Sequence, residues 1–115
     1  MNDATPSSAE TQLRELMTCE DHEHNIEWLQ QALQTAIALE FATVPLYLTA
    51  FWSIVDPTHE AARQIRDVVQ EEMLHVSLAC NRLTAIGGAP SLTGRDFVPQ
   101  YPGGLPDPIE RGGDV

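Results

Sequence analysis

Basic residues are scarce in this chain. Of its 115 residues, 6 are lysine or arginine and 17 are aspartate or glutamate, which gives a formal net charge of −11 at pH 7. Such a surface repels phosphate groups, so the charge argues against nucleic acid and anionic membranes as partners. The same charge favours solubility and attracts cations.

Cysteines and targeting signals are also few. Cys19 and Cys80 are the two cysteines, and they lie too far apart to form a CxxC motif, which is typical of reduced thiols in a cytoplasmic protein. The amino-terminal stretch MNDATPSSAE lacks the basic start and apolar core of a signal peptide. The longest uninterrupted apolar run is far too short to span a bilayer. We therefore expect a cytoplasmic protein with no membrane partner.

Helical periodicity predicts two long helices. Hydrophobic residues make up 43% of the chain, enough for the core of one small domain. From Ile26 to about Val55 the apolar residues recur at intervals of three and four, as on one face of a helix. A second helix is predicted from Pro57 to about Ile86. Asp56-Pro57 is typical of a helix start, and the Gly pair at 87–88 predicts its end.

Three segments follow from this division of the chain. Residues 1–24 form a polar tail with a short helix predicted over 10–20, residues 25–88 form the two-helix hairpin, and residues 89–115 form a tail with five Gly and five Pro. Two amphipathic helices alone leave much of their apolar surface uncovered. We therefore predict an all-α fold, an antiparallel helical hairpin that completes a four-helix bundle by homodimerisation.

Three ionisable residues interrupt the apolar stripes of these helices. Glu40 lies within the stripe of the first helix, and Glu72 and His75 take two successive places in the stripe of the second. Glu40 is 16 residues before Asp56 and Glu72 is 16 residues after it. Both residues therefore lie about 24 Å from the turn of an antiparallel hairpin. We expect Glu40 and Glu72 to lie at one level, with His75 one turn further on.

A shared metal ion explains why three costly polar residues occupy one level of the bundle. Carboxylates and an imidazole suit iron or manganese. Glu72-x-x-His75 places both donors on one helical face. Di-iron and di-manganese bundles use one Glu from each of two helices and a Glu-x-x-His from each of the other two. One chain supplies half of this set, so the prediction is a homodimer with two metal ions, iron or manganese, held by Glu40, Glu72 and His75.

Other polar residues leave alternatives open. Glu71 lies at the flank of the stripe, where a solvated residue or a partner of the ligands is expected more than a ligand. Tyr47 is either a core residue or a redox residue. Pro45 is expected to kink the first helix, which would either open a substrate pocket or shape packing alone. His22 and His24 could bind a surface metal, or simply be exposed.

The sequence also resembles a known family. The stretches LQTAIALEFATVPLYLTAFWSI, EEMLHVSLACNRLTAIGGAP and YPGGLP are similar to the ferritin-like domain of the iminophenyl-pyruvate dimer synthase family, over roughly residues 25–106. The resemblance implies a ferritin-like bundle with a carboxylate-bridged metal centre, and Glu40, Glu72 and His75 as its ligands. It also implies the coupling of two imines derived from an aromatic amino acid. Those proteins are longer, so this chain is either a half-bundle that dimerises or a part of a longer protein.

Three functions are compatible with these features. The first is an oxidative enzyme that uses dioxygen or peroxide on a small, amino-acid-derived organic substrate. The second is an iron-handling protein of the ferroxidase or storage type, which the acidic charge also fits. The third is a dimerisation module without a metal. In the first two, at least one of Glu40 and Glu72 is expected to bridge the metals, with His75 as a terminal ligand.

Overall fold

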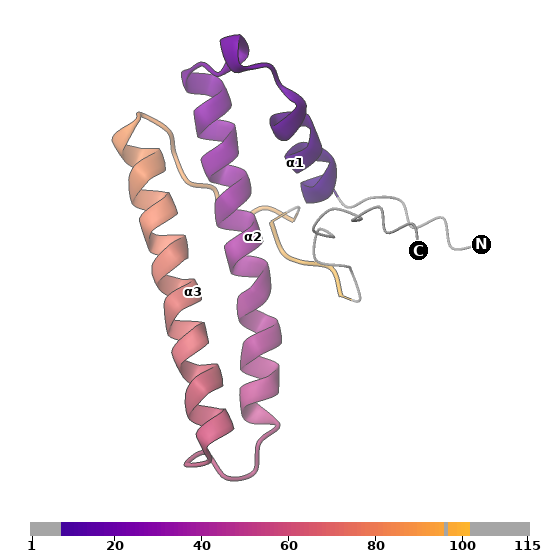
Figure 1. Ribbon diagram of the computed structural model, residues 1–115, viewed down its shortest axis with the longest axis vertical. Helices are drawn as coiled ribbons and strands as arrows, with labels where there is room; N and C mark the ends of the chain where they lie inside the picture. Colours follow the sequence, from indigo (N-terminus) through magenta and orange to yellow (C-terminus); the bar gives the residue numbers. More distant parts are fainter. Residues whose placement is uncertain (1–7, 96, 102–115) are drawn as a thin grey trace, which may run out of the picture.

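The computed structural model describes residues 8–95 and 97–101, and these residues are helical or irregular, with no strand among them. The helices are α1 (Ser8–Thr18), the short 3-10 helix η1 (Asp21–Glu23), α2 (Ile26–Trp52) and α3 (Glu60–Ala85) (Figure 1). Helices α2 and α3 lie side by side as an antiparallel hairpin. The predicted all-α class is therefore confirmed. Most of the YPGGLP motif lies outside the described residues.

Helix α2 begins at a conventional cap. The side chain of Asn25 accepts a hydrogen bond from the backbone N–H of Trp28 at 2.9 Å, which satisfies a donor of the first turn. The helix then continues through Pro45, and the Thr49 hydroxyl donates to the Pro45 carbonyl at 2.8 Å. It ends at Trp52, three residues before the predicted end.

The predicted start of the second helix is wrong by three residues. Asp56 does not cap the helix, because its Oδ1 accepts from the N–H of Thr58 at 2.9 Å and from the Thr58 hydroxyl at 2.6 Å. This local turn competes with helix formation. Helix α3 begins at Glu60, and its cap is His59, whose Nδ1 accepts from the N–H of Ala61 at 3.1 Å.

The end of α3 follows from the two glycines, as predicted. Gly87 has φ +83°, a left-handed conformation that side chains rarely adopt. The N–H of Gly88 donates to the Leu83 carbonyl at 2.9 Å, and a Cβ at this position would lie 2.3 Å from the Leu83 side chain. The chain therefore turns sharply after Ile86 and returns along α2.

The core between α2 and α3 is small. Ile37, Val76 and Leu83 are its buried residues. The predicted stripe of the second helix passed through His75 and left out Val76, and here the prediction is wrong, because Val76 is buried in the core against α2. His75 lies on the flank, with 48% of its side chain exposed.

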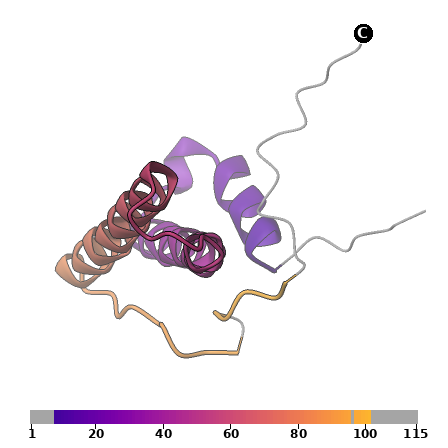
Figure 2. The same cartoon turned by 90° about the horizontal axis from the view of Figure 1, so that it is seen from below.

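Helix α2 is covered on three sides. Helix α3 packs on one side, and α1 packs on another, where the Trp28 indole donates to the Leu16 carbonyl at 3.2 Å. The segment after α3 runs along a third side (Figure 2). There Gln34 exchanges two hydrogen bonds of 2.9 Å with the backbone of Ser91, and Phe97 packs on Phe41 with ring centroids 4.8 Å apart.

The apolar character of α2 is stronger than its uninterrupted runs indicated. Its most apolar window of 18 residues has a mean hydropathy of 1.3, so by length and composition alone this helix could cross a membrane. Core helices of soluble bundles meet the same criterion. Only 17% of that window is buried in the single chain, which leaves apolar surface to be covered.

Candidate metal centre

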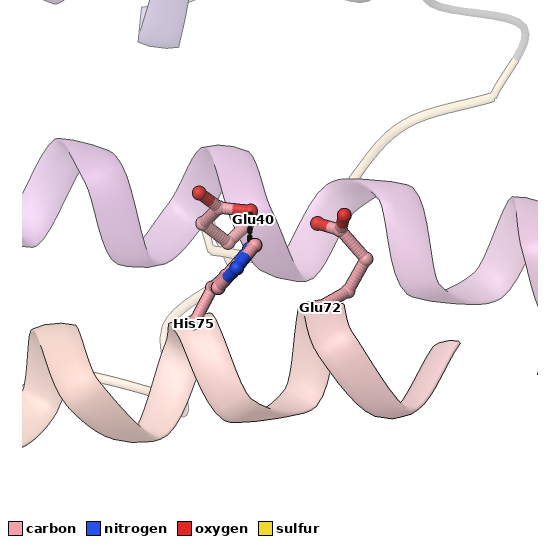
Figure 3. A group of neighbouring side chains, drawn as sticks. All are labelled: Glu40, Glu72 and His75. Carbon is pink, nitrogen blue, oxygen red and sulfur yellow. Dashed lines mark ion pairs between the residues drawn. The ribbon is translucent and has the colours of Figure 1, made fainter. Parts of the chain in front are cut away.

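The structure brings Glu40, Glu72 and His75 together between α2 and α3. Each residue offers one ligand atom, and these atoms all lie within 4.8 Å of one another. In Figure 3, Glu72 and His75 point from successive turns of α3 toward α2, and Glu40 points from α2 toward His75. Among the described residues, no other three His, Cys, Asp or Glu side chains lie close enough together to share an ion.

The register of the hairpin differs from the predicted one by about one turn. The Glu40 carboxylate pairs with His75, with Oε2 and Nδ1 at 3.5 Å. Glu72 lies opposite Thr43, whose hydroxyl is 3.1 Å from its Oε2. The prediction placed Glu40 level with Glu72 because it centred the hairpin on Asp56. Since α3 begins only at Glu60, the centre lies further along the chain, between residues 57 and 58.

The electrostatics of the group favour a bound cation. Burial raises the pKa of the Glu40 carboxyl above its ordinary value of 4.5, and the hydrogen bond and charge of Glu72 raise it further, while His75 lowers it. Two carboxylates held this close repel each other when both are ionised. A positive ion between them would remove that repulsion.

The donor set also fits a transition metal. Two carboxylate oxygens and one imidazole nitrogen suit iron, manganese or zinc, and no thiolate takes part. Both carboxylates are half-buried, and the imidazole reaches them from the flank of α3. Small side-chain movements would bring the three donors within bonding distance of one ion.

The other residues that the sequence analysis considered for a functional role do not belong to this group. Glu71 is exposed, as expected for a solvated flank residue, and Tyr47 is 38% exposed. His22 and His24 are exposed and lie in the connection between α1 and α2, where His24 stacks on Trp28 with ring centroids 3.9 Å apart. These two histidines are therefore separate from the Glu/Glu/His group.

A substrate pocket beside Glu40 remains a prediction. Two cavities of about 480 and 240 Å³ lie between α1 and α2. Leu16 and Trp28 line both of them, and neither is lined by Glu40, Glu72 or His75.

Sequence reasoning missed Thr43. Its hydroxyl lies 2.8 Å from the Glu40 carbonyl and 3.1 Å from Oε2 of Glu72. The signal that could have found it is spacing, because Thr43 follows Glu40 by three residues and so lies on the same face of the helix. Only the correct register shows that this position is opposite Glu72.

The fold and the site together define a helical-bundle protein with a candidate carboxylate–histidine metal centre. The family model described as Ferritin-like matches residues 33–115, so the chain belongs to the Ferritin-like family. This fold often binds metals, frequently as a di-metal carboxylate centre. No curated protein and no solved structure matches the chain.

Proposed function

We propose that this protein is a di-metal carboxylate oxidoreductase that acts on a small organic substrate. The observation that carries the proposal is the convergence of Glu40, Glu72 and His75, from two helices, within 4.8 Å in a Ferritin-like chain. The resemblance to the iminophenyl-pyruvate dimer synthase family supports an amino-acid-derived substrate. Iron is the metal we propose, with manganese as the alternative.

The residues of the chain have distinct tasks in this proposal. Glu40 and Glu72 supply the negative charge that holds the metal ions, and His75 supplies a neutral nitrogen donor. The hairpin fixes the spacing of these donors, because each projects from a long helix rather than from a loop. When bound, the iron pair would supply the electrons that reduce dioxygen or peroxide.

A second copy of the chain is the proposed source of the remaining ligands. Leu29, Glu40, Thr43 and Tyr47 follow one another at helical spacing and so share one stripe of α2, and on this stripe Glu40 and Thr43 contact α3. Leu29 and Tyr47 are 39% and 38% exposed. A two-fold copy docked on this stripe would cover apolar surface and bring a second Glu40 and a second Glu-x-x-His to the same level.

Native mass spectrometry of protein loaded with Fe(II) tests the metal and the assembly together. The expected species is a dimer with two iron ions, and His75→Ala should lose the iron. His22→Ala is the matched control, since His22 is exposed in the connection between α1 and α2 and is separate from the group. A metal-free monomer in the wild type would contradict the proposal.

Oxygen consumption separates an organic oxidase from an iron-handling protein. With a panel of amino-acid-derived imines and indoles, an oxidase should consume oxygen in proportion to substrate at a fixed, catalytic amount of iron. If oxygen is consumed only in proportion to added Fe(II), the ferroxidase function would be correct instead. The net charge of −11, which attracts cations, is the feature that favours this second function.

A further inference from the structure

We infer that Thr43 is a positioning residue, which holds the Glu72 carboxylate in place for metal binding. This inference rests on the proposed metal site but concerns a residue that would not itself bind the metal. Thr43 lies on α2 and Glu72 on α3, so their contact crosses the hairpin. Its hydroxyl oxygen is 3.1 Å from Oε2 of Glu72, a hydrogen-bonding distance.

The hydroxyl has two acceptors for one proton. It lies 2.8 Å from the Glu40 carbonyl and 3.1 Å from Glu72 Oε2, and it can donate to only one of them at a time. The bond to an ionised carboxylate is the stronger type. Thr43 therefore either bonds to the Glu40 backbone within α2 or reaches across the hairpin to the Glu72 carboxylate.

Glu72 needs such a partner because its side chain is long. A glutamate side chain has three rotatable bonds, and ordering it costs conformational entropy. Both Thr43 and Glu72 are half-buried, so their bond is sheltered from competing water more than a surface bond would be. Hydrogen-bond partners of metal ligands typically change metal affinity by about 10–100-fold when they are removed.

The test compares variants of position 43 that keep the hydroxyl with variants that lack it. Thr43→Val keeps the shape and removes the hydroxyl, and Thr43→Ser keeps the hydroxyl. Thr49→Val is the matched control, because Thr49 is on the same helix and donates to the Pro45 carbonyl at 2.8 Å, six residues from Thr43. The probe is Co²⁺, titrated into metal-free protein and followed by its visible absorption and by calorimetry.

Thr43→Val should weaken Co²⁺ binding about tenfold. Thr43→Ser should restore the wild-type affinity to within about twofold, and Thr49→Val should leave it unchanged. The visible absorption of bound Co²⁺ should also change in Thr43→Val, since a purely structural role would not alter the ligand field. If Thr43→Val fails to fold, Thr43→Ala against Thr43→Ser makes the same comparison, because these residues differ by one oxygen.

Two results would overturn the inference, and they can be told apart. Equal Co²⁺ affinity in wild type, Thr43→Val and Thr43→Ser would mean that the hydroxyl does not position Glu72, while the metal site itself would stand. No Co²⁺ binding by the wild type would mean that both the site and the role of Thr43 toward it are wrong.

Discussion

Glu71 and Glu72 are adjacent residues of the same type, and the fold gives them different surroundings. Glu72 is half-buried and hydrogen-bonded to Thr43, whereas Glu71 is exposed. We predict that Glu72→Gln weakens Co²⁺ binding by at least about 100-fold, since under the proposed function it removes a ligand rather than a partner of a ligand. Glu71→Gln makes the same change of charge one position away and should leave affinity nearly unchanged.

Competition titration against a chelator of known affinity measures both variants. Thermal unfolding without metal serves as the control for folding. Equal losses of affinity in the two variants would mean that general negative charge attracts the ion, and that no specific ligand set exists.

At the scale of single residues, the sequence predicts the ionisable residues of the candidate metal site better than the threonine that bonds to one of them. Glu40, Glu72 and His75 could be predicted as a group because a charge within an apolar stripe is costly without a partner. Spacing places Thr43 on the same helical face as Glu40, but its position opposite Glu72 could not be predicted, because that position depends on the register of the hairpin. Which residues of α2 and α3 lie opposite one another depends on where α3 begins, and the turn at Asp56 determines that start.

At the scale of the helical elements, two hydrogen bonds from Thr58 to Asp56 form the turn before α3. The hydrogen bonds from the Thr58 hydroxyl and N–H lower the pKa of Asp56 below its ordinary value of 3.8. A lowered pKa in the folded state stabilises the fold above the unfolded value, and that contribution is lost as the pH falls through the folded value. Thr58→Ala should therefore lower Tm slightly at pH 7, and the difference should shrink below about pH 3.8.

Thermal unfolding of wild type and Thr58→Ala between pH 2.5 and 7 measures this difference. Thr84→Ala is a suitable control, because Thr84 donates to the Cys80 carbonyl within α3 and to no carboxylate. A difference that stays constant down to pH 2.5 would show that the ionisation of Asp56 does not contribute.

The packing of α2 on α3 depends strongly on Ile37, which is fully buried. We predict that Ile37→Ala destabilises the fold by about 2–5 kcal/mol, because it leaves a cavity in a core of few residues. Leu46→Ala, at an exposed position of the same helix, should change stability by less than about 0.5 kcal/mol. Urea unfolding followed by circular dichroism measures both, and similar costs would contradict the observed core.

Helix boundaries divide into those that the sequence predicts and those that it does not. The start of α2 at Ile26 and the end of α3 before Gly87 follow from local signals in the sequence, an apolar period and the Gly pair at 87–88. The start of α3 does not, because Asp56 can either cap a helix or bond to Thr58, and only the folded chain distinguishes the two. The rotation of α3 depends on packing, which buries Val76 in the core and leaves His75 partly exposed at the edge of the contact with α2.

At the scale of the whole molecule, the single chain leaves apolar surface beside its candidate metal site. The most apolar window of α2 is only 17% buried, and Leu29 and Tyr47 are partly exposed on the stripe that contains Glu40. When folding is coupled to dimerisation, the stability of the protein rises with protein concentration. A ligand that binds the folded dimer increases that stability further. Both effects are expected here if a second copy covers this stripe.

We therefore predict that Leu29→Glu weakens self-association and that Leu92→Glu does not. Leu29 is 39% exposed on the stripe of Glu40, whereas Leu92 is 46% exposed in the segment that covers another side of α2. A carboxylate buried without a partner is costly, so the dimer Kd should rise at least about tenfold in Leu29→Glu. Sedimentation velocity over a hundredfold range of concentration, with and without Co²⁺, measures it. If Leu29→Glu dimerises like the wild type, the second copy does not dock on this stripe, and if the wild type stays monomeric throughout, the remaining ligands cannot come from a second copy.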